Sequence, residues 1–176
     1  MPFAIHKKII CDVLVIGSGG AGLRAAIAAA ESGADVLMVS KTRIGYATNT
    51  YLSKAIIAAS GWGDDKDSSS VHTSDTLEGG RFLNNPDMVA RFTHTIRSET
   101  ALLKEWGVGF GTDKTGKPTI VKIPGHSFSR HLHGRNWQGS DLVMPLKKKG
   151  IVFCYMSGFW RKKVLYSGMP PVKISW

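Results

Sequence analysis

The chain has 176 residues, of which 43% are hydrophobic, and a formal net charge of +10. This length and composition suffice for one ordinary domain with its own core. The charge is uneven, with 16 basic against 13 acidic residues through Asp141 and seven basic but no acidic residues after it. Because most of the chain carries the mixed charges of a solvated surface, we expect no nucleic-acid partner.

The cysteines and the N-terminal residues indicate a compartment. Cys11 and Cys154 form neither a metal-ligand spacing nor a disulfide framework, which suits a reducing environment. Residues 1–10 lack the apolar segment and cleavage site of a secretory signal, and no apolar stretch is long enough to span a bilayer. These features predict a cytoplasmic protein.

The most informative stretch is residues 11–41. It predicts a buried strand at 12–16, a glycine turn at 17–22, a helix at 23–32 and a second buried strand at 35–40. A Gly-x-Gly-x-x-Gly turn between an apolar strand and a helix is typical of a βαβ dinucleotide-binding unit. A parallel-sheet turn that binds no nucleotide is the alternative.

The small residues of this turn have separate mechanical roles. Gly17 permits the tight turn, Gly19 lets the backbone approach a pyrophosphate, and Gly22 lets the helix pack against the strand. Gly20 and Ala21 lie near the helix N-terminus, where N–H groups and the positive end of the helix dipole favour an anion. We therefore predict that these five residues bind the cofactor.

The end of the second strand lacks the carboxylate that commonly binds the ribose of such cofactors. Ser40 and Lys41 stand there instead, and the Ser40 hydroxyl would bond one ribose hydroxyl. Lys41 and Arg43 would also suit a 2′-phosphate, so an NADP site remains an alternative.

The stretch 42–63 is poor in charge and rich in hydroxyl residues. Its hydroxyl and amide groups would hydrogen-bond a phosphate or the polar edge of a flavin, and the predicted cofactor-binding residues here are Thr42, Thr48, Asn49 and Thr50. A polar loop without a ligand is the alternative.

Further along the chain, the patterns predict four elements. They are a short helix or strand at 55–60, helices at 71–79 and 87–106, and a β-hairpin at 108–124. A further helix begins near residue 139, and we expect Pro145 and the three lysines after Leu146 to end it early.

Individual side chains of this region also receive predictions. We expect the acidic turn at 64–70 to be a solvated loop, and His72 and His94 each to be a surface or helix-face histidine rather than a metal ligand. Met88 and Phe92 fall at helical spacing with other apolar residues, which places them in the core.

Residues 125–139 contain three histidines and two arginines within ten positions. A metal site is one interpretation, although no Asp, Glu or Cys lies close to the histidines in the sequence. A cationic loop beside a nucleotide or carboxylate ligand fits better, because Arg and protonated His pair with anions.

The character of the chain changes near Gly150. The tail is aromatic and basic without a clear period, and it lacks acidic residues. It is interpreted as a β-segment with a basic surface, as a membrane-surface anchor, or as a segment not selected as part of the fold, and we favour the last.

Three motifs together resemble the N-terminal part of the flavoprotein subunit of succinate dehydrogenase and fumarate reductase, and of the related L-aspartate oxidases. They are residues 15–26 around the glycine turn, Val39-Ser40-Lys41, and Gly125-His126-Ser127 followed by Arg130. The resemblance covers about four-fifths of the chain. It implies an α/β fold, namely an incomplete Rossmann-like FAD-binding βαβ domain of the glutathione-reductase type.

The resemblance also implies a division of the chain and a cofactor. Residues 1–146 would be the N-terminal portion of the FAD-binding domain, and residues 147–176 a tail that does not match the family. FAD would lie with its ADP on the glycine turn, and His126 and Ser127 would lie near the flavin. Asn49 stands where the succinate dehydrogenases have the histidine that bonds to the flavin, so we expect non-covalent FAD.

The function implied by the resemblance is that of the full-length relatives, which transfer hydride between the flavin and a dicarboxylate. The residues that bind the dicarboxylate lie outside this chain, so we predict no catalytic residue and no metal site here. The alternatives are a FAD- or nucleotide-binding fragment without turnover and an L-aspartate oxidase-like protein. The family further implies iron-sulfur or membrane subunits as partners, and a peripheral position on the inner face of the membrane.

Overall fold

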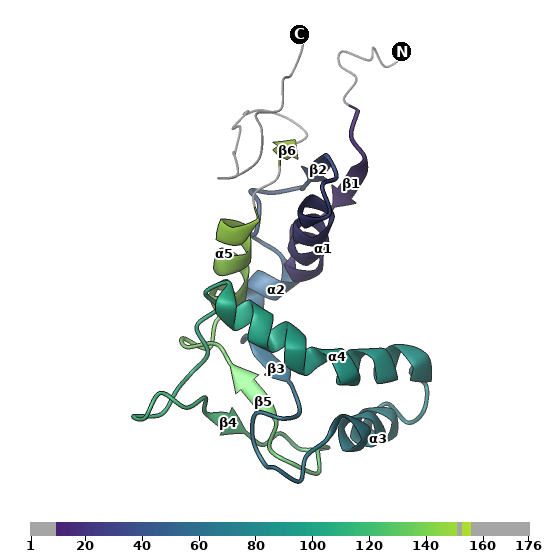
Figure 1. Ribbon diagram of the computed structural model, residues 1–176, viewed down its shortest axis with the longest axis vertical. Coiled ribbons are helices and arrows are strands. Elements are labelled where there is room, and N and C mark those ends of the chain that lie inside the picture. The colour runs from purple at the N-terminus through teal and green to yellow at the C-terminus, as the bar shows by residue number, and fades with distance from the viewer. Residues whose placement is uncertain (1–9, 151–152, 156–176) are drawn as a thin grey trace. The chain divides into compact units, whose positions relative to one another are not determined.

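The computed structural model describes residues 10–150 and the backbone of residues 153–155. The described residues divide into two compact units, one made of residues 10–48 with those from 147 on, and the other of residues 49–146. Figure 1 shows the helices and strands of both, and each unit is described by itself. The tail after residue 155 lies outside the described residues.

The first unit contains the predicted βαβ arrangement. Strand β1 (Val13–Ile16), helix α1 (Gly20–Glu31) and strand β2 (Val36–Val39) follow one another in the chain. The two strands pair in parallel, with Val13 opposite Val36. Strand β6 (Phe153–Tyr155) pairs in parallel with the other edge of β2, which gives the strand order β1-β2-β6. The α/β Rossmann-like class is confirmed, with a three-stranded sheet among the described residues.

One side of this small sheet packs against α1. The helix buries the residues Leu23, Ala26, Ile27 and Ala30, and β2 buries Val36 and Met38. The prediction of a fully buried first strand is wrong, because Leu14 and Ile16 are 53% and 80% exposed. Their side chains alternate with the half-buried Val13 and Val15, as expected for a strand covered on one face only.

The second unit is built on a mixed arrangement of short strands and two packed helices. Strands β3 (Ile56–Ala58), β5 (His131–His133) and β4 (Ile120–Val121) form an antiparallel sheet in that order. Helices α3 (Ser69–Gly79) and α4 (Pro86–Glu105) pack against each other, and the short α2 (Asn49–Leu52) precedes β3.

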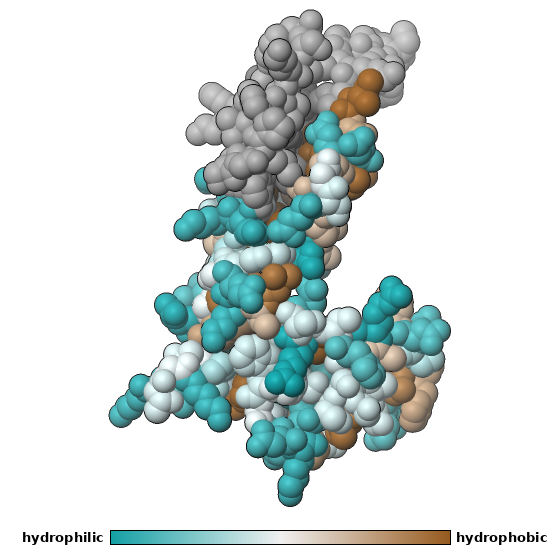
Figure 2. Space-filling view, viewed as in Figure 1, coloured by the Kyte–Doolittle hydropathy of each residue, from teal (hydrophilic) through white to brown (hydrophobic). Residues whose placement is uncertain are grey.

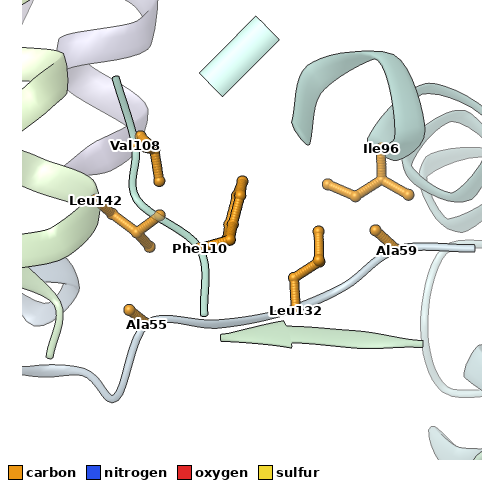
Figure 3. Packing of buried hydrophobic residues seen from close by; sticks show 7 residues of the cluster. All are labelled: Ala55, Ala59, Ile96, Val108, Phe110, Leu132 and Leu142. Atoms are coloured by element: carbon orange, nitrogen blue, oxygen red, sulfur yellow. The ribbon is translucent and has the colours of Figure 1, made fainter. Parts of the chain in front are cut away.

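The core of this unit joins the sheet, α4 and the start of α5 (Ser140–Lys149). Figure 3 shows the side chains of Leu132 and Phe110 among apolar groups that come from different parts of the chain. The full cluster consists of Ala55, Ala59, Ile96, Val108, Phe110, Leu132 and Leu142. Burial of such side chains is the main force that stabilises the unit, at roughly 1.5–3 kcal/mol for each large side chain.

The boundaries of three predicted elements need correction. Helix α1 begins at Gly20, three residues before the predicted start. Helix α5 continues through Pro145, because a proline removes only one backbone hydrogen bond and Leu142, Val143 and Leu146 are buried around it. The tight turn of the predicted hairpin forms, with Thr112 opposite Pro118, but β4 pairs with β5.

Helix α4 exposes two residues that the pattern placed in the core. Met88 is 71% exposed and Phe92 is 44% exposed. The buried stripe instead contains Val89, Ile96 and two threonines, whose hydroxyls donate to carbonyl oxygens one turn earlier in the helix. Figure 2 shows hydrophobic atoms where α3 and α4 are joined. Among the described helices, none is long and apolar enough to cross a membrane.

Candidate functional site

The glycine turn between β1 and α1 has a geometry that requires glycine at two positions. Gly17 has φ +106°, which favours glycine, and its N–H donates to the Val39 carbonyl over 2.8 Å. A Cβ on Gly22 would collide with the Gly17 carbonyl oxygen. The turn therefore closes tightly under the start of α1, as its sequence predicted.

The N-terminus of α1 presents backbone groups rather than side chains. The residue that caps it is Gly19, in an extended conformation with φ −75°, and no side chain forms a cap hydrogen bond. The first turn contains no acidic residue. The helix is 12 residues long and follows a tight glycine turn. Its N-terminus therefore suits the pyrophosphate of a dinucleotide. The residues present therefore fit a FAD diphosphate.

Ser40 links the glycine turn to the loop after β2. Its Oγ lies 2.7 Å from Ser18 Oγ, and the Gly45 N–H donates to the same Ser18 oxygen over 3.1 Å. Both serine side chains are buried. A ribose hydroxyl that bonds to Ser40 would therefore bind an oxygen that already forms a hydrogen bond with Ser18.

The other predicted residues of this unit lie in the loop after β2. Lys41 is exposed, whereas the Thr42 hydroxyl donates to the Tyr46 carbonyl over 2.8 Å. Arg43, which belongs to the NADP alternative, lies over the Tyr46 ring at 4.9 Å. Thr48 is half-buried and is the last residue of this part of the first unit.

Asn49 and Thr50 belong to the second unit, where they begin α2. Asn49 is exposed and Thr50 is half-buried. A Cβ on Gly139 would collide with the Thr50 carbonyl oxygen, and the Gly139 N–H donates to the Ser53 carbonyl over 2.7 Å. Gly139 therefore holds α2 close to the start of α5.

The predicted cationic loop contains a buried and neutralised arginine. Arg130 is fully buried, and its Nε and Nη2 donate to the two carboxylate oxygens of Asp67 over 3.0 and 2.8 Å. Its Nη1 donates to Asp75 Oδ2 over 2.6 Å. A buried guanidinium with two carboxylates is fully paired, so it offers no free charge to an anionic ligand.

His126 and Ser127 are connected to this same group. The Ser127 N–H and hydroxyl donate to the Asp75 carboxylate over 2.9 and 2.7 Å. Arg130 Nη1 donates to His126 Nδ1 over 3.1 Å, which requires an unprotonated Nδ1 because a guanidinium has no acceptor. Desolvation, followed by the Arg130 charge, lowers the pKa of His126, while Asp75 and Asp67 oppose this shift.

Two further histidines lie next to His126. The His131 ring centroid is 4.5 Å from that of His126, and the His72 centroid is 5.9 Å from it. Desolvation is also the largest cause that lowers the pKa of His131, and it lowers the pKa of His72 from 6.5 to about 4, with Arg130 adding to the effect. We call these three histidines with Asp67, Asp75 and Arg130 the buried charged cluster.

Four expectations from the sequence are corrected by this cluster. Asp67 is buried rather than solvated, and His72 lies on the buried face of helix α3 rather than at the surface, whereas His94 is exposed on α4 as predicted. Residues 131–133 form the buried strand β5 instead of a loop. Arg130, one of the two arginines of residues 125–139, is paired with two carboxylates, so it adds no free positive charge to the segment.

Among the residues that the structure describes, no group of three His, Cys, Asp or Glu side chains has the geometry to hold a metal ion. His133 lies apart from the buried charged cluster, with its ring stacked on Trp137 at 3.9 Å and its Nε2 2.7 Å from Thr119 Oγ1.

Sequence reasoning missed Asp67, Asp75 and His72 as members of one site. The two carboxylates lie 63 and 55 residues from Arg130 in the chain. No local pattern marks the arginine, because Arg130 stands between Ser129 and His131, directly before β5. A buried arginine must find a partner, but the sequence around it does not show that it is buried.

Comparisons with known proteins identify relatives of one kind. The family model described as FAD binding domain matches residues 12–164, a range that includes β6 and part of the tail. A fumarate reductase (CoM/CoB) chain of Methanothermobacter marburgensis is 32% identical over 142 residues, which is 80% of this chain and 26% of the relative. The L-aspartate oxidase of Mycobacterium tuberculosis is 32% identical over 161 residues, or 89% of this chain and 30% of the relative.

Solved structures lead to the same group. The Mycobacterium smegmatis Sdh1 complex in the apo form superposes with a TM-score of 0.75 and 36% identity, over 79% of this chain and 23% of that chain. The E. coli quinol fumarate reductase gives a TM-score of 0.73 and 30% identity, over 79% and 24%. The present chain therefore spans about a quarter of the length of the relatives it matches.

Proposed function

This chain belongs to the FAD binding domain family, and on that premise we propose that it is the FAD-binding front of a flavoprotein oxidoreductase. The type is that of succinate dehydrogenase and fumarate reductase, because relatives of this kind match over about four-fifths of the chain. The observation that carries the proposal is the glycine turn at 17–22. Gly22 leaves no room for a Cβ against the Gly17 carbonyl oxygen, and no side chain forms a cap hydrogen bond at the N-terminus of α1.

Residues of the first unit would hold the ADP half of FAD. The N-terminal backbone of α1, from Gly19 to Gly22, would bind the pyrophosphate, and Ser40 with Lys41 would lie at the ribose end of β2. The bound flavin supplies the hydride acceptor, and the protein supplies position and charge. Asn49 cannot form the covalent link made by a histidine, so the FAD is non-covalent.

The substrate of the whole protein is a dicarboxylate in this proposal, as the names of the fumarate reductase relatives suggest. An amino-dicarboxylate, as in the L-aspartate oxidases, is the second candidate because these relatives are equally similar. No residue of this chain is assigned a catalytic role. We therefore expect no reduction of an artificial dye by succinate or aspartate with this chain alone, and reduction of the dye would show that the chain contains a complete active site.

Partners and location follow the same reasoning. Similar solved structures are of complexes, including a quinol-fumarate reductase with menaquinol molecules. We propose that the whole protein assembles with iron-sulfur or membrane subunits and works on the inner face of the membrane.

The cofactor assignment is tested by adding FAD to the purified full chain and measuring retained flavin absorbance after gel filtration. Gly19→Val is the informative variant, because valine readily adopts the extended angles of Gly19 while its methyl groups occupy the approach of the pyrophosphate. We expect affinity for FAD to fall by at least about 100-fold, or about 2.7 kcal/mol.

The matched control is Gly79→Val at the last residue of α3, where an added Cβ meets nothing within 4 Å. Circular dichroism should show the same helix content in both variants. A wild-type chain that stays colourless after soaking with FAD, or equal FAD affinity of wild type and Gly19→Val, would overturn the proposal.

A further inference from the structure

The buried charged cluster contains more titratable groups than a simple structural ion pair needs. Asp67 and Asp75 already pair with Arg130, yet three imidazoles also gather around the guanidinium. His72 Nδ1 is buried without a hydrogen-bond partner among the described residues. The paired Arg130 guanidinium therefore lies against one imidazole nitrogen, His126 Nδ1, and close to two further histidine rings.

We propose that this cluster is a proton-operated latch that holds residues 125–129 against α3 and releases them when His126 is protonated. It stands apart from the proposed function, since every group lies in the unit Asn49–Leu146. The latch is a local conformational device, and it requires neither cofactor nor substrate.

The closed state depends on an unprotonated His126. Asp75 holds the segment through the Ser127 N–H and hydroxyl, and Arg130 Nη1 bridges Asp75 and His126 Nδ1. A proton on Nδ1 would face an N–H donor at 3.1 Å and would place a second cation beside the guanidinium. The imidazolium therefore has to leave this position, and the segment that carries it moves with it.

The groups around His126 decide the balance between closing and opening. His72 and Asp75 face this histidine from α3, and Asp67 faces it from the turn before α3. Arg130 faces it from the residue before β5, and His131 from the first residue of β5. The two carboxylates favour a proton on His126, but both are already engaged by Arg130. Desolvation and the guanidinium oppose the proton and outweigh them.

The neighbouring histidines make the opening more complete once it begins. His131 Nδ1 donates to the Val121 carbonyl over 3.2 Å. A further proton on His131 would therefore bind at Nε2 and make the ring positively charged. His72 shares the repulsion from Arg130 and from His126. Each proton bound by one of these histidines thus increases its repulsion from Arg130 and from the other histidines, and this repulsion weakens the closed state.

The test is hydrogen exchange of the Ser127 amide in the full chain at pH 7 and pH 5, corrected for intrinsic exchange. We expect protection of the Ser127 amide to fall about tenfold. The upper limit is about 25-fold, which would apply if His126 could not be protonated at all in the closed state. The Thr115 amide, which donates to the exposed carboxylate of Asp113 over 2.8 Å, is an internal control and should not change.

Two variants separate the latch from other causes. His126→Gln retains a hydrogen-bond acceptor but does not titrate, so the loss of Ser127 protection between pH 7 and pH 5 should be much smaller than in wild type. His94→Gln alters an exposed histidine of α4 and should behave as wild type. Equal Ser127 protection at both pH values in wild type, or the same loss in His126→Gln, would overturn the proposal.

A direct titration keeps the proposal testable if His126→Gln does not fold. In wild type, the Ser127 amide signal should change with the same apparent pKa as the His126 ring protons in NMR spectra. A change that instead follows a carboxyl group, below pH 4, would show that Asp75 and not His126 controls the segment.

Discussion

Burial of His72 makes the stability of the second unit depend on pH. His72 is 1% exposed and packs edge-on against Phe92, with ring centroids 5.8 Å apart. Desolvation, helped by the Arg130 charge, lowers its pKa from 6.5 to about 4. Between these values the unfolded chain binds the proton and the folded chain does not, so folding becomes less favourable as the pH falls.

The magnitude follows from the two pKa values. The contribution of His72 is intact above pH 6.5 and is lost progressively below it, with a full loss of about 3 kcal/mol below pH 4. Between pH 7.5 and pH 5 the loss is about 2 kcal/mol, which corresponds to a shift of about 1 M in the urea midpoint of a small domain.

Urea unfolding followed by tryptophan fluorescence measures this difference. His72→Gln removes the titrating group. Between pH 7.5 and pH 5 the free energy of unfolding of the variant should therefore fall by about 2 kcal/mol less than that of wild type. His94→Gln, an exposed change on α4, should match wild type. Equal pH dependence of wild type and His72→Gln would refute the assignment of the lowered pKa to His72.

Two further predictions concern buried polar groups. Asp67→Asn should lower the free energy of unfolding by about 3 kcal/mol because it removes one carboxylate from the buried guanidinium. Asp65→Asn, the same change at an exposed position two residues away, should stay within about 0.5 kcal/mol, and similar urea midpoints for the two would contradict this. Ser18→Ala should cost about 1–3 kcal/mol and speed exchange of the Gly45 amide, which loses its acceptor. Ser32→Ala, at an exposed hydroxyl after α1, should leave that amide unchanged, and slow exchange in both would argue against the Ser18 bond.

Local pattern was sufficient for the elements whose partners are close in the sequence. The β1-α1-β2 unit, the start of α4 and the turn at 113–118 all appear where the apolar period, Pro86 and the turn residues placed them. Burial of individual side chains was less accurate. Periodicity gives one helix face, but whether Phe92 on that face is covered depends on what packs against α4.

The sequence by itself determined the glycine turn, since Gly17 needs a positive φ and Gly22 leaves no room for a Cβ, and both requirements are local. Only the tertiary structure decided what the histidine-rich stretch does. Arg130 meets Asp67 and Asp75 across 63 and 55 positions of chain, and no spacing within 125–139 encodes that encounter. A buried charge must be paired, wherever in the sequence its partners lie. In the folded unit, Arg130 of the predicted cationic loop is therefore buried and paired with two carboxylates.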